Sequence, residues 1–256
     1  MSETSPRGRF VWYDLMTTDA AGAAAFYRQV AGWGTQVWEG SPTPYMMWTV
    51  QGTPIGGLMQ LGSTAGAVPF WLGYVAVPDV DASAKQAEAL GGKVLSAPRD
   101  IPEVGRFAVI ADPQGAAIAI FTPRDAPPAP DGAPNVGEFS WHELTTTDHV
   151  KAYDFYQQLF GWEKTREFDM GEMGVYQVYG RGGQTLGGMW TKPKGDAAPT
   201  SWLYYIRVPN TDQAAARVTE LGGQVVSGPM DVPSGDRVAQ CLDPQGAAFA
   251  VQSSAG

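Results

Sequence analysis

The sequence presents nearly the same pattern twice, about 130 residues apart. A series that begins WxxLxTTD at Trp12 and continues to FYxxxxGW at Phe26 recurs from Trp141 and from Phe155. The later parts match as well, with DPQGAA at 112–117 and again at 243–248. A repeat of this length is that of a whole domain, because solenoid units span only roughly 20 to 50 residues. The sequence therefore predicts two similar domains in tandem.

Composition restricts the class of protein further. The chain has 256 residues, 44% of them hydrophobic, so each half can bury a core of its own. The net charge of -9, without a cluster of Lys and Arg along the sequence, argues against nucleic acid and anionic membranes as partners and favours a small-molecule ligand. Cys241 is the single cysteine, which excludes an intrachain disulfide and a cysteine-built zinc site. The N-terminus lacks a signal-peptide core and no apolar run reaches about 18 residues, so we expect a cytoplasmic protein.

Proline and glycine mark the division between the halves. The stretch 123–136 is rich in both, and we predict a surface linker there between a first domain at 8–122 and a second at 137–253. In the first half, we expect a strand at 10–16 and a helix that begins after the N-cap Asp19 and ends at Gly32. Three strands should follow, at 35–38, 45–50 and 55–61.

The same order then starts again within each half. A strand at 71–77 and a helix at 81–90 precede three more strands, at 93–95, 106–111 and 117–121. The second half repeats the pattern, with 202–208 in place of 71–77. We therefore predict an α+β fold of four βαβββ units.

These motifs resemble a known superfamily. The Asp-capped helix with FYxxxxGW, the helix that ends in LGG and the DPxG turn before the last strand are similar to those of the vicinal oxygen chelate superfamily. That superfamily includes glyoxalase I, bleomycin-resistance proteins and extradiol dioxygenases. More narrowly, the two fused glyoxalase-like domains resemble a group of bacterial proteins described as hydroxylases or 27-kDa antigens. The resemblance implies two cup-shaped domains in tandem, each with a ligand on its concave face.

The resemblance also implies a divalent metal, and the sequence departs from it at that point. The superfamily's metal is held by His, Glu or Gln. The positions that correspond to its ligands are occupied by Trp12, Leu72 and Ala119 in the first half. In the second half they are Trp141, Leu203 and Ala250. None of these side chains binds a metal, so we expect no cofactor and leave a divalent ion as the disfavoured alternative.

Strand alternation instead predicts an aromatic pocket with one acid in each half. If Trp12 points into the cup, Asp14 does too, and Trp141 and Glu143 follow the same rule, with His142 turned away. The acids are candidate general acids or bases, or structural groups that bond neighbouring backbone. Other residues on predicted strands could line the pocket or simply fill the core, and we include these as candidate ligand contacts: Trp48, Met59, Trp71, Trp190 and Trp202.

Two arginines repeat as well. Arg106 and Arg237 each lie four residues after the proline of a DIP or DVP segment. They either recognise a ligand carboxylate or carbonyl, or form ion pairs with a nearby acid such as Asp100 or Asp231. Cys241 is expected to be a buried small residue rather than a nucleophile.

Taken together, these patterns favour a metal-independent protein that binds a small apolar or aromatic metabolite or natural product, in sequestration, resistance or detoxification. An enzyme of the same fold is the main alternative. It would be a lyase, isomerase or hydroxylase that uses Asp14 or Glu143 as acid–base, or a metal-dependent glyoxalase or dioxygenase. A catalytically degenerate scaffold for protein partners is a third. Either a monomer or a homodimer fits the duplicated chain.

Overall fold

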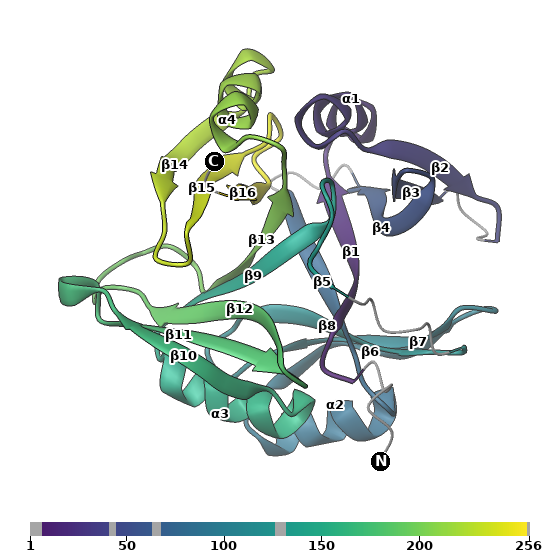
Figure 1. The fold of residues 1–256 in the computed structure, drawn as a ribbon. Coiled ribbons are helices and arrows are strands. Elements are labelled where there is room, and N and C mark those ends of the chain that lie inside the picture. The colour runs from purple at the N-terminus through teal and green to yellow at the C-terminus, as the bar shows by residue number, and fades with distance from the viewer. Residues whose placement is uncertain (1–6, 41–44, 63–67, 126–131, 255–256) are drawn as a thin grey trace. The chain divides into compact units, whose positions relative to one another are not determined.

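The computed structural model describes residues 7–40, 45–62, 68–125 and 132–254, so positions 126–131 of the expected linker lie outside the described residues. The predicted order of strand, helix and three strands occurs four times (Figure 1). The first two units comprise β1 (Phe10–Thr17), α1 (Ala20–Ala31), β2 (Gly34–Trp38), β3 (Tyr45–Val50), β4 (Thr53–Gln60), then β5 (Phe70–Ala76), α2 (Val80–Ala89), β6 (Lys93–Ile101), β7 (Gly105–Ala111) and β8 (Ala117–Pro123).

The second half repeats this plan with one added 3-10 turn at Gly171–Met173. Its elements are β9 (Phe139–Thr146), α3 (His149–Phe160), β10 (Glu163–Asp169), β11 (Val175–Arg181), β12 (Gln184–Thr191), then β13 (Ser201–Arg207), α4 (Thr211–Glu220), β14 (Gln224–Asp231), β15 (Asp236–Leu242) and β16 (Ala248–Ser254). Among the described residues, none of the helices has the length and hydropathy needed to cross a membrane.

The strands form two mixed sheets of eight, which confirms the predicted α+β fold. Their orders are β2-β3-β4-β1-β5-β8-β7-β6 and β10-β11-β12-β9-β13-β16-β15-β14. In the first βαβββ unit, strand β1 pairs in parallel with β4, and Asp14 lies opposite Gly57. In the third βαβββ unit, the equivalent pairing of β9 with β12 places Glu143 opposite Gly188. Because opposed residues of neighbouring strands share a face, this register fixes what lies beside each acid.

The predicted ends of the helix in the first βαβββ unit are confirmed, and the helix of the third βαβββ unit ends in the same way. The side chain of Asp19 accepts a hydrogen bond from the backbone N–H of Gly22 at 2.9 Å, and α1 ends at Gly32 with φ of 73°. Asp148 accepts in the same way from Lys151 at 3.1 Å, and Gly161 ends α3 with the same φ. The N-cap acids satisfy amide donors that the helix leaves without partners, and glycine adopts the left-handed conformation at no steric cost.

One strand is longer than its sequence predicted. β6 covers Lys93–Ile101, although only 93–95 was expected to be extended. Pro98 and the small residues around it weakened the strand pattern. β6 lies at the end of its sheet, where proline is tolerated because one side of the strand makes no ladder bonds.

The chain also divides into two compact units, named unit 1 and unit 2, which are distinct from the four βαβββ units. They do not follow the order of the sequence. Unit 1 contains residues 1–11, 73–132 and 142–202, and unit 2 contains 12–72, 133–141 and 203–256. Helix α2 packs against α3 in unit 1, and α1 packs against α4 in unit 2 (Figure 1). Each unit therefore combines segments from both halves of the sequence.

Aromatic side chains dominate the core of each unit. In unit 2 the ring of Tyr27 contacts Trp33, Trp48 and Trp71, at centroid distances between 5.3 and 5.6 Å. In unit 1 the equivalent Tyr156 contacts Trp162 and Trp202. These clusters bury the Phe, Tyr and Trp residues of the repeated motif, so the motif reflects packing between helix and sheet.

Candidate functional site

Asp14 forms the centre of a small polar cluster in unit 2. Its carboxylate accepts a hydrogen bond from the hydroxyl of Tyr45 at 2.7 Å, and the indole N–H of Trp12 lies 2.9 Å from both the carboxylate and the Tyr45 oxygen. Asp14 is only 3% exposed. Burial, followed by the charge of Asp14, raises the pKa of Tyr45 above its ordinary value. The phenol therefore stays protonated and donates to the carboxylate.

Unit 1 contains the same arrangement. The hydroxyl of Tyr176 donates to the carboxylate of Glu143 at 2.8 Å, and Glu143 is 7% exposed. Glu143 and Asp14 hold equivalent places in β9 and β1, and Tyr176 and Tyr45 hold equivalent places in β11 and β3. The duplicated feature is thus an acid–tyrosine pair, in which the acid can be Asp or Glu.

Each pair lies on the sheet face that points away from the helix. Trp48, three residues after Tyr45, contacts Tyr27 of α1, so the alternation of β3 turns Tyr45 to the other face. Tyr179, three residues after Tyr176, stacks on Trp162 at 4.2 Å, with the same consequence. The acids and tyrosines are therefore kept out of the aromatic cores.

A glycine makes room for each tyrosine. A Cβ atom added to Gly57 would overlap the hydroxyl of Tyr45 and the carboxylate of Asp14, and one added to Gly188 would overlap the ring of Tyr176. Glycine inside a strand often marks such a close approach. The two tyrosines were missing from the predicted site. The repeated Gly-Gly pairs in β4 and β12 were the signal in the sequence that could have pointed to them.

In the second half of the sequence, the three positions that correspond to the superfamily's metal ligands lie together in one apolar cluster. Trp141, Leu203 and Ala250 all belong to one group in unit 2, packed with Tyr205, Val238 and Val232. Within the part of the chain that the structure describes, no three His, Cys, Asp or Glu side chains come together to hold a metal ion. The side chains at these positions offer no oxygen or nitrogen donor, so they do not fit a divalent metal.

The other predicted contact residues fall into two groups. Trp48 and Trp71 lie within the aromatic core of unit 2, and Trp202 lies in that of unit 1, each 7% exposed or less. Met59 is 38% exposed, and it shares the face of Asp14 because the register places Met16 opposite Met59. Trp190 is half-buried and opposes Thr145 and Tyr176, so it shares the face of Glu143.

Each of the repeated arginines forms ion pairs with two acids. The Arg106 guanidinium bonds Asp81 at 2.7 Å and Asp100 at 2.8 Å. Arg237 bonds Asp212 at 2.6 Å and Asp231 at 2.9 Å. Each arginine therefore joins the first turn of a helix to an edge strand of its sheet, as the alternative interpretation predicted.

Two further residues with titratable side chains, His142 and Cys241, are buried. His142 stacks on Phe10 with ring centroids 3.8 Å apart, and its Nδ1 lies 2.6 Å from the carbonyl oxygen of Leu186. Burial lowers the pKa of His142 to about 4. Burial raises the pKa of the Cys241 thiol to about 12, so the thiol stays protonated at neutral pH. Neither residue lies on the face that carries the acid–tyrosine pairs.

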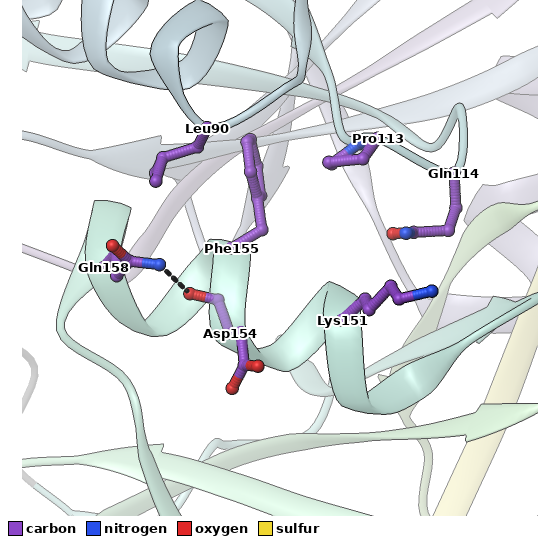
Figure 2. A pocket seen from close by; sticks show the side chains of 7 residues that line it. All are labelled: Leu90, Pro113, Gln114, Lys151, Asp154, Phe155 and Gln158. Carbon is purple, nitrogen blue, oxygen red and sulfur yellow. Dashed lines mark hydrogen bonds between the residues drawn. The ribbon is translucent and has the colours of Figure 1, made fainter.

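Unit 1 also contains a surface hollow of about 240 Å³ at the side of α3 (Figure 2). The ring of Phe155 stands between Leu90 and Pro113, and the amide of Gln158 donates to the backbone oxygen of Asp154 at 3.1 Å. The remaining lining residues are Gln114 and Lys151. The hollow contains none of the predicted site residues.

Comparison with known families identifies the superfamily of this chain. Residues 138–251 match the Glyoxalase/Bleomycin resistance protein/Dioxygenase superfamily, and residues 11–121 match the glyoxalase-like domain. A Mycobacterium tuberculosis protein named "Putative glyoxylase CFP32" is 35% identical over 94% of this chain and 92% of its own length. The chain belongs to this superfamily, which confirms the resemblance seen in its motifs.

Further similarity is found to a biosynthetic protein and to solved enzymes. The anthracycline biosynthesis protein DnrV of Streptomyces peucetius is 33% identical over 95% of this chain and 92% of its own. The Mn(II)-bound glyoxalase of Novosphingobium aromaticivorans has a TM-score of 0.65 at 16% identity, covering 99% of this chain and 83% of that protein. The 2,3-dioxygenase LapB of Pseudomonas sp. KL28 reaches 0.69 at 11% identity, with 98% and 93% covered. At these identities the solved structures establish the shared fold alone.

Proposed function

We propose that the protein binds a small, largely apolar or aromatic metabolite or natural product on the sheet faces that carry the acid–tyrosine pairs. The observation that carries this proposal is the repetition of the pair. Asp14 with Tyr45, and Glu143 with Tyr176, hold the same places although the acid differs. The pairs lie on the face away from the aromatic cores, so the packing of those cores does not account for them, and a ligand site would be copied together with its domain.

The chemistry of the pair suits a ligand with both apolar surface and a polar group. A buried carboxylate is costly unless hydrogen bonds stabilise it, and the phenol supplies one. The acid and phenol oxygens can then accept a hydrogen bond from a ligand hydroxyl or amine. Met59 and Trp190, partly exposed on the same faces, offer apolar contact surface beside them.

The relatives support an aromatic natural product as the ligand class. DnrV, which aligns over almost the whole chain, is named for anthracycline biosynthesis. Anthracyclines are flat, fused-ring compounds that carry hydroxyl groups, which matches the combination of apolar surface and hydrogen-bonding oxygens. We accordingly propose sequestration, resistance or handling of such a compound as the biological role.

We further propose that binding needs no metal ion. The apolar packing of Trp141, Leu203 and Ala250 supports this, because the superfamily holds its metal with nitrogen and oxygen donors at these positions. The role then left to the protein is to orient the ligand by hydrogen bonds and to exclude water from its apolar part.

An enzyme of the same fold is the second candidate, and one observation favours it. Asp14 and Glu143 are buried acids within hydrogen-bond distance of a phenol, an arrangement able to hold and transfer a proton. CFP32 is named a glyoxylase, which points in the same direction. In this candidate the acids would be the general acid or base. A scaffold for protein partners, the third candidate, would use neither acid.

Metal analysis with native mass spectrometry of the purified protein is the first test. We expect substoichiometric divalent metal and, where a ligand co-purifies, an added organic mass. A stoichiometric divalent ion that chelation removes together with ligand binding would contradict the metal-independent proposal.

A titration then separates the candidates. The probe is a hydroxyanthraquinone, followed by quenching of the fluorescence of the protein's nine tryptophans. In the Asp14→Asn, Glu143→Gln double variant we expect the dissociation constant to rise by less than about tenfold, because each change removes one charge and retains the shape. Acid–base turnover would instead fall by about a hundredfold or more. Asp100→Asn is the matched control, and a wild-type protein that does not bind the probe contradicts the aromatic ligand class.

A further inference from the structure

The two acid–tyrosine pairs have similar aromatic surroundings on one side. In unit 2, Trp38 of β2 lies opposite Tyr45, and in unit 1, Phe168 of β10 lies opposite Tyr176. Each tyrosine also lies against a glycine of the neighbouring strand. A difference between the two faces therefore has to come from the remaining positions around each pair.

In unit 2 these remaining positions are occupied by methionine. Met47 lies opposite Gly57, which in turn lies opposite Asp14, so Met47 shares the face of that acid. Met16, two residues after Asp14, lies opposite Met59 on the same face. Met16 and Met47 are half-buried and Met59 is exposed. A ligand beside Asp14 is thus within reach of flexible thioether side chains.

In unit 1 the same three positions hold a valine, a threonine and a tryptophan. Val178 lies opposite Gly188 and is buried. Trp190 lies opposite Tyr176 on one side and Thr145 on the other, and both Trp190 and Thr145 are half-buried. Where unit 2 offers flexible chains, unit 1 offers a rigid indole with a hydroxyl-bearing residue next to it.

Methionine and tryptophan place different demands on a ligand. The methionine side chain is unbranched, freely rotatable and polarizable, so it adapts to irregular shapes and contacts aromatic rings as well as aliphatic ones. An indole is flat and stiff, and it makes its best contact with another flat ring stacked on it. A ring system with projecting methyl groups is held away from the indole and loses dispersion contacts. Specificity of this kind comes from what a site rejects.

We propose that the site of unit 1 selects planar fused aromatic rings, whereas the site of unit 2 accepts planar and non-planar ring systems alike, with Trp190 and Met59 as the residues that set the difference. The difference rests on the proposed function, since both faces must be ligand sites. Trp12 does not remove it, because its indole N–H points at Asp14 and Tyr45 and so turns the edge of the ring toward the pair.

Isothermal titration of the full chain with two probes tests the proposal. A hydroxyanthraquinone is planar, whereas androstanediol, a saturated steroid diol, carries methyl groups that project from its rings. We expect the hydroxyanthraquinone to bind at both sites and androstanediol only at that of unit 2. Gly57→Ala obstructs the site of unit 2 and should weaken androstanediol binding by at least about tenfold, whereas Gly188→Ala obstructs the site of unit 1 and should leave it unchanged.

Substitution of the two selecting residues gives a gain of binding that loss of the fold cannot imitate. Trp190→Met should add a second androstanediol site and weaken hydroxyanthraquinone binding in unit 1 by about threefold to tenfold, the value of one stacking contact. Trp190→Phe keeps a flat ring and should keep the selectivity. Met59→Trp should weaken androstanediol binding in unit 2. Val37→Trp is the matched control, because Val37 is exposed and lies opposite Met46 on the other face of the sheet.

The outcomes separate this proposal from the proposed function. If neither probe binds the wild type, both are overturned. If the hydroxyanthraquinone binds and androstanediol occupies both sites or neither, only the difference between the sites is overturned. A Trp190→Met protein that gains no androstanediol site would have the same meaning.

Discussion

The hydroxyl of Tyr156 donates a hydrogen bond to the carboxylate of Asp112 at 3.0 Å, which ties helix α3 of one half of the sequence to the DPQG turn of the other. The second oxygen of Asp112 accepts the amides of Gln114 and Ala116, both at 2.9 Å. The same acid thus forms the turn, as its sequence predicted, and connects it to the helix. Tyr27 and Asp243 repeat the relationship in unit 2 at 3.2 Å.

Removing one of these hydroxyls should destabilise the protein measurably. In Tyr156→Phe the buried carboxylate of Asp112 loses a donor, and we expect about 1 to 3 kcal/mol of lost unfolding free energy. Tyr27→Phe should cost a similar amount, because its environment is the same. Urea unfolding followed by tryptophan fluorescence gives both values. Losses below about 0.5 kcal/mol in both variants would show that these bonds contribute nothing beyond the turn itself.

Stability should depend on the protonation of His142. Its folded pKa of about 4 lies below the ordinary value of 6.5, so between these values the unfolded chain binds the proton and the folded chain does not. The contribution is present above pH 6.5 and is lost as the pH falls toward 4, by about 3 kcal/mol in all. His142→Phe keeps the stack on Phe10 and removes the titration.

The difference between the wild-type and His142→Phe stability curves isolates this contribution, because other buried acids titrate in both proteins. As the pH falls from 7 to 4, the stability of the wild type, measured by urea unfolding at half-unit steps, should fall by about 3 kcal/mol relative to that of His142→Phe. Parallel curves would mean that His142 keeps an ordinary pKa in the folded protein.

The glycines beside the tyrosines should be sensitive to a single added carbon. Gly57→Ala and Gly188→Ala would displace Tyr45 and Tyr176, so we expect the anthraquinone probe to bind at least about tenfold more weakly, together with a stability loss of about 1 to 3 kcal/mol. Gly62→Ala is the control, because a Cβ there meets no atom within 4 Å. If Gly57→Ala and Gly188→Ala bind like Gly62→Ala, the acid–tyrosine pairs do not form the ligand site.

Replacement of the repeated arginines tests their part in binding. Arg106 and Arg237 are each held by two acids, so we expect Arg106→Ala and Arg237→Ala to leave probe binding unchanged. Their effect on stability should be small and should shrink further in high salt. A loss of probe affinity in either variant, with the fold intact by circular dichroism, would restore the arginine to the ligand site.

The sequence predicted the parts of the fold that depend on local signals. The caps Asp19 and Gly32 mark their helix because the cap geometry involves residues three or four apart. The orientation of Trp48 and Trp71 could not be predicted from the sequence. Their strands are apolar on both faces, so alternation does not identify the face that packs on the core. Tyr45 depends on the register of β3 against β4 and β1, which no local pattern fixes.

The course of the chain through the two compact units has a consequence for how the molecule comes apart. The unit boundaries fall between residues 11 and 12, 72 and 73, 141 and 142, and 202 and 203, which is inside β1, β5, β9 and β13. A protease that cut at the proline-rich segment would therefore leave two fragments, each of which supplies part of both units. Neither fragment carries a complete unit, so the nicked protein should migrate as one particle until its units unfold.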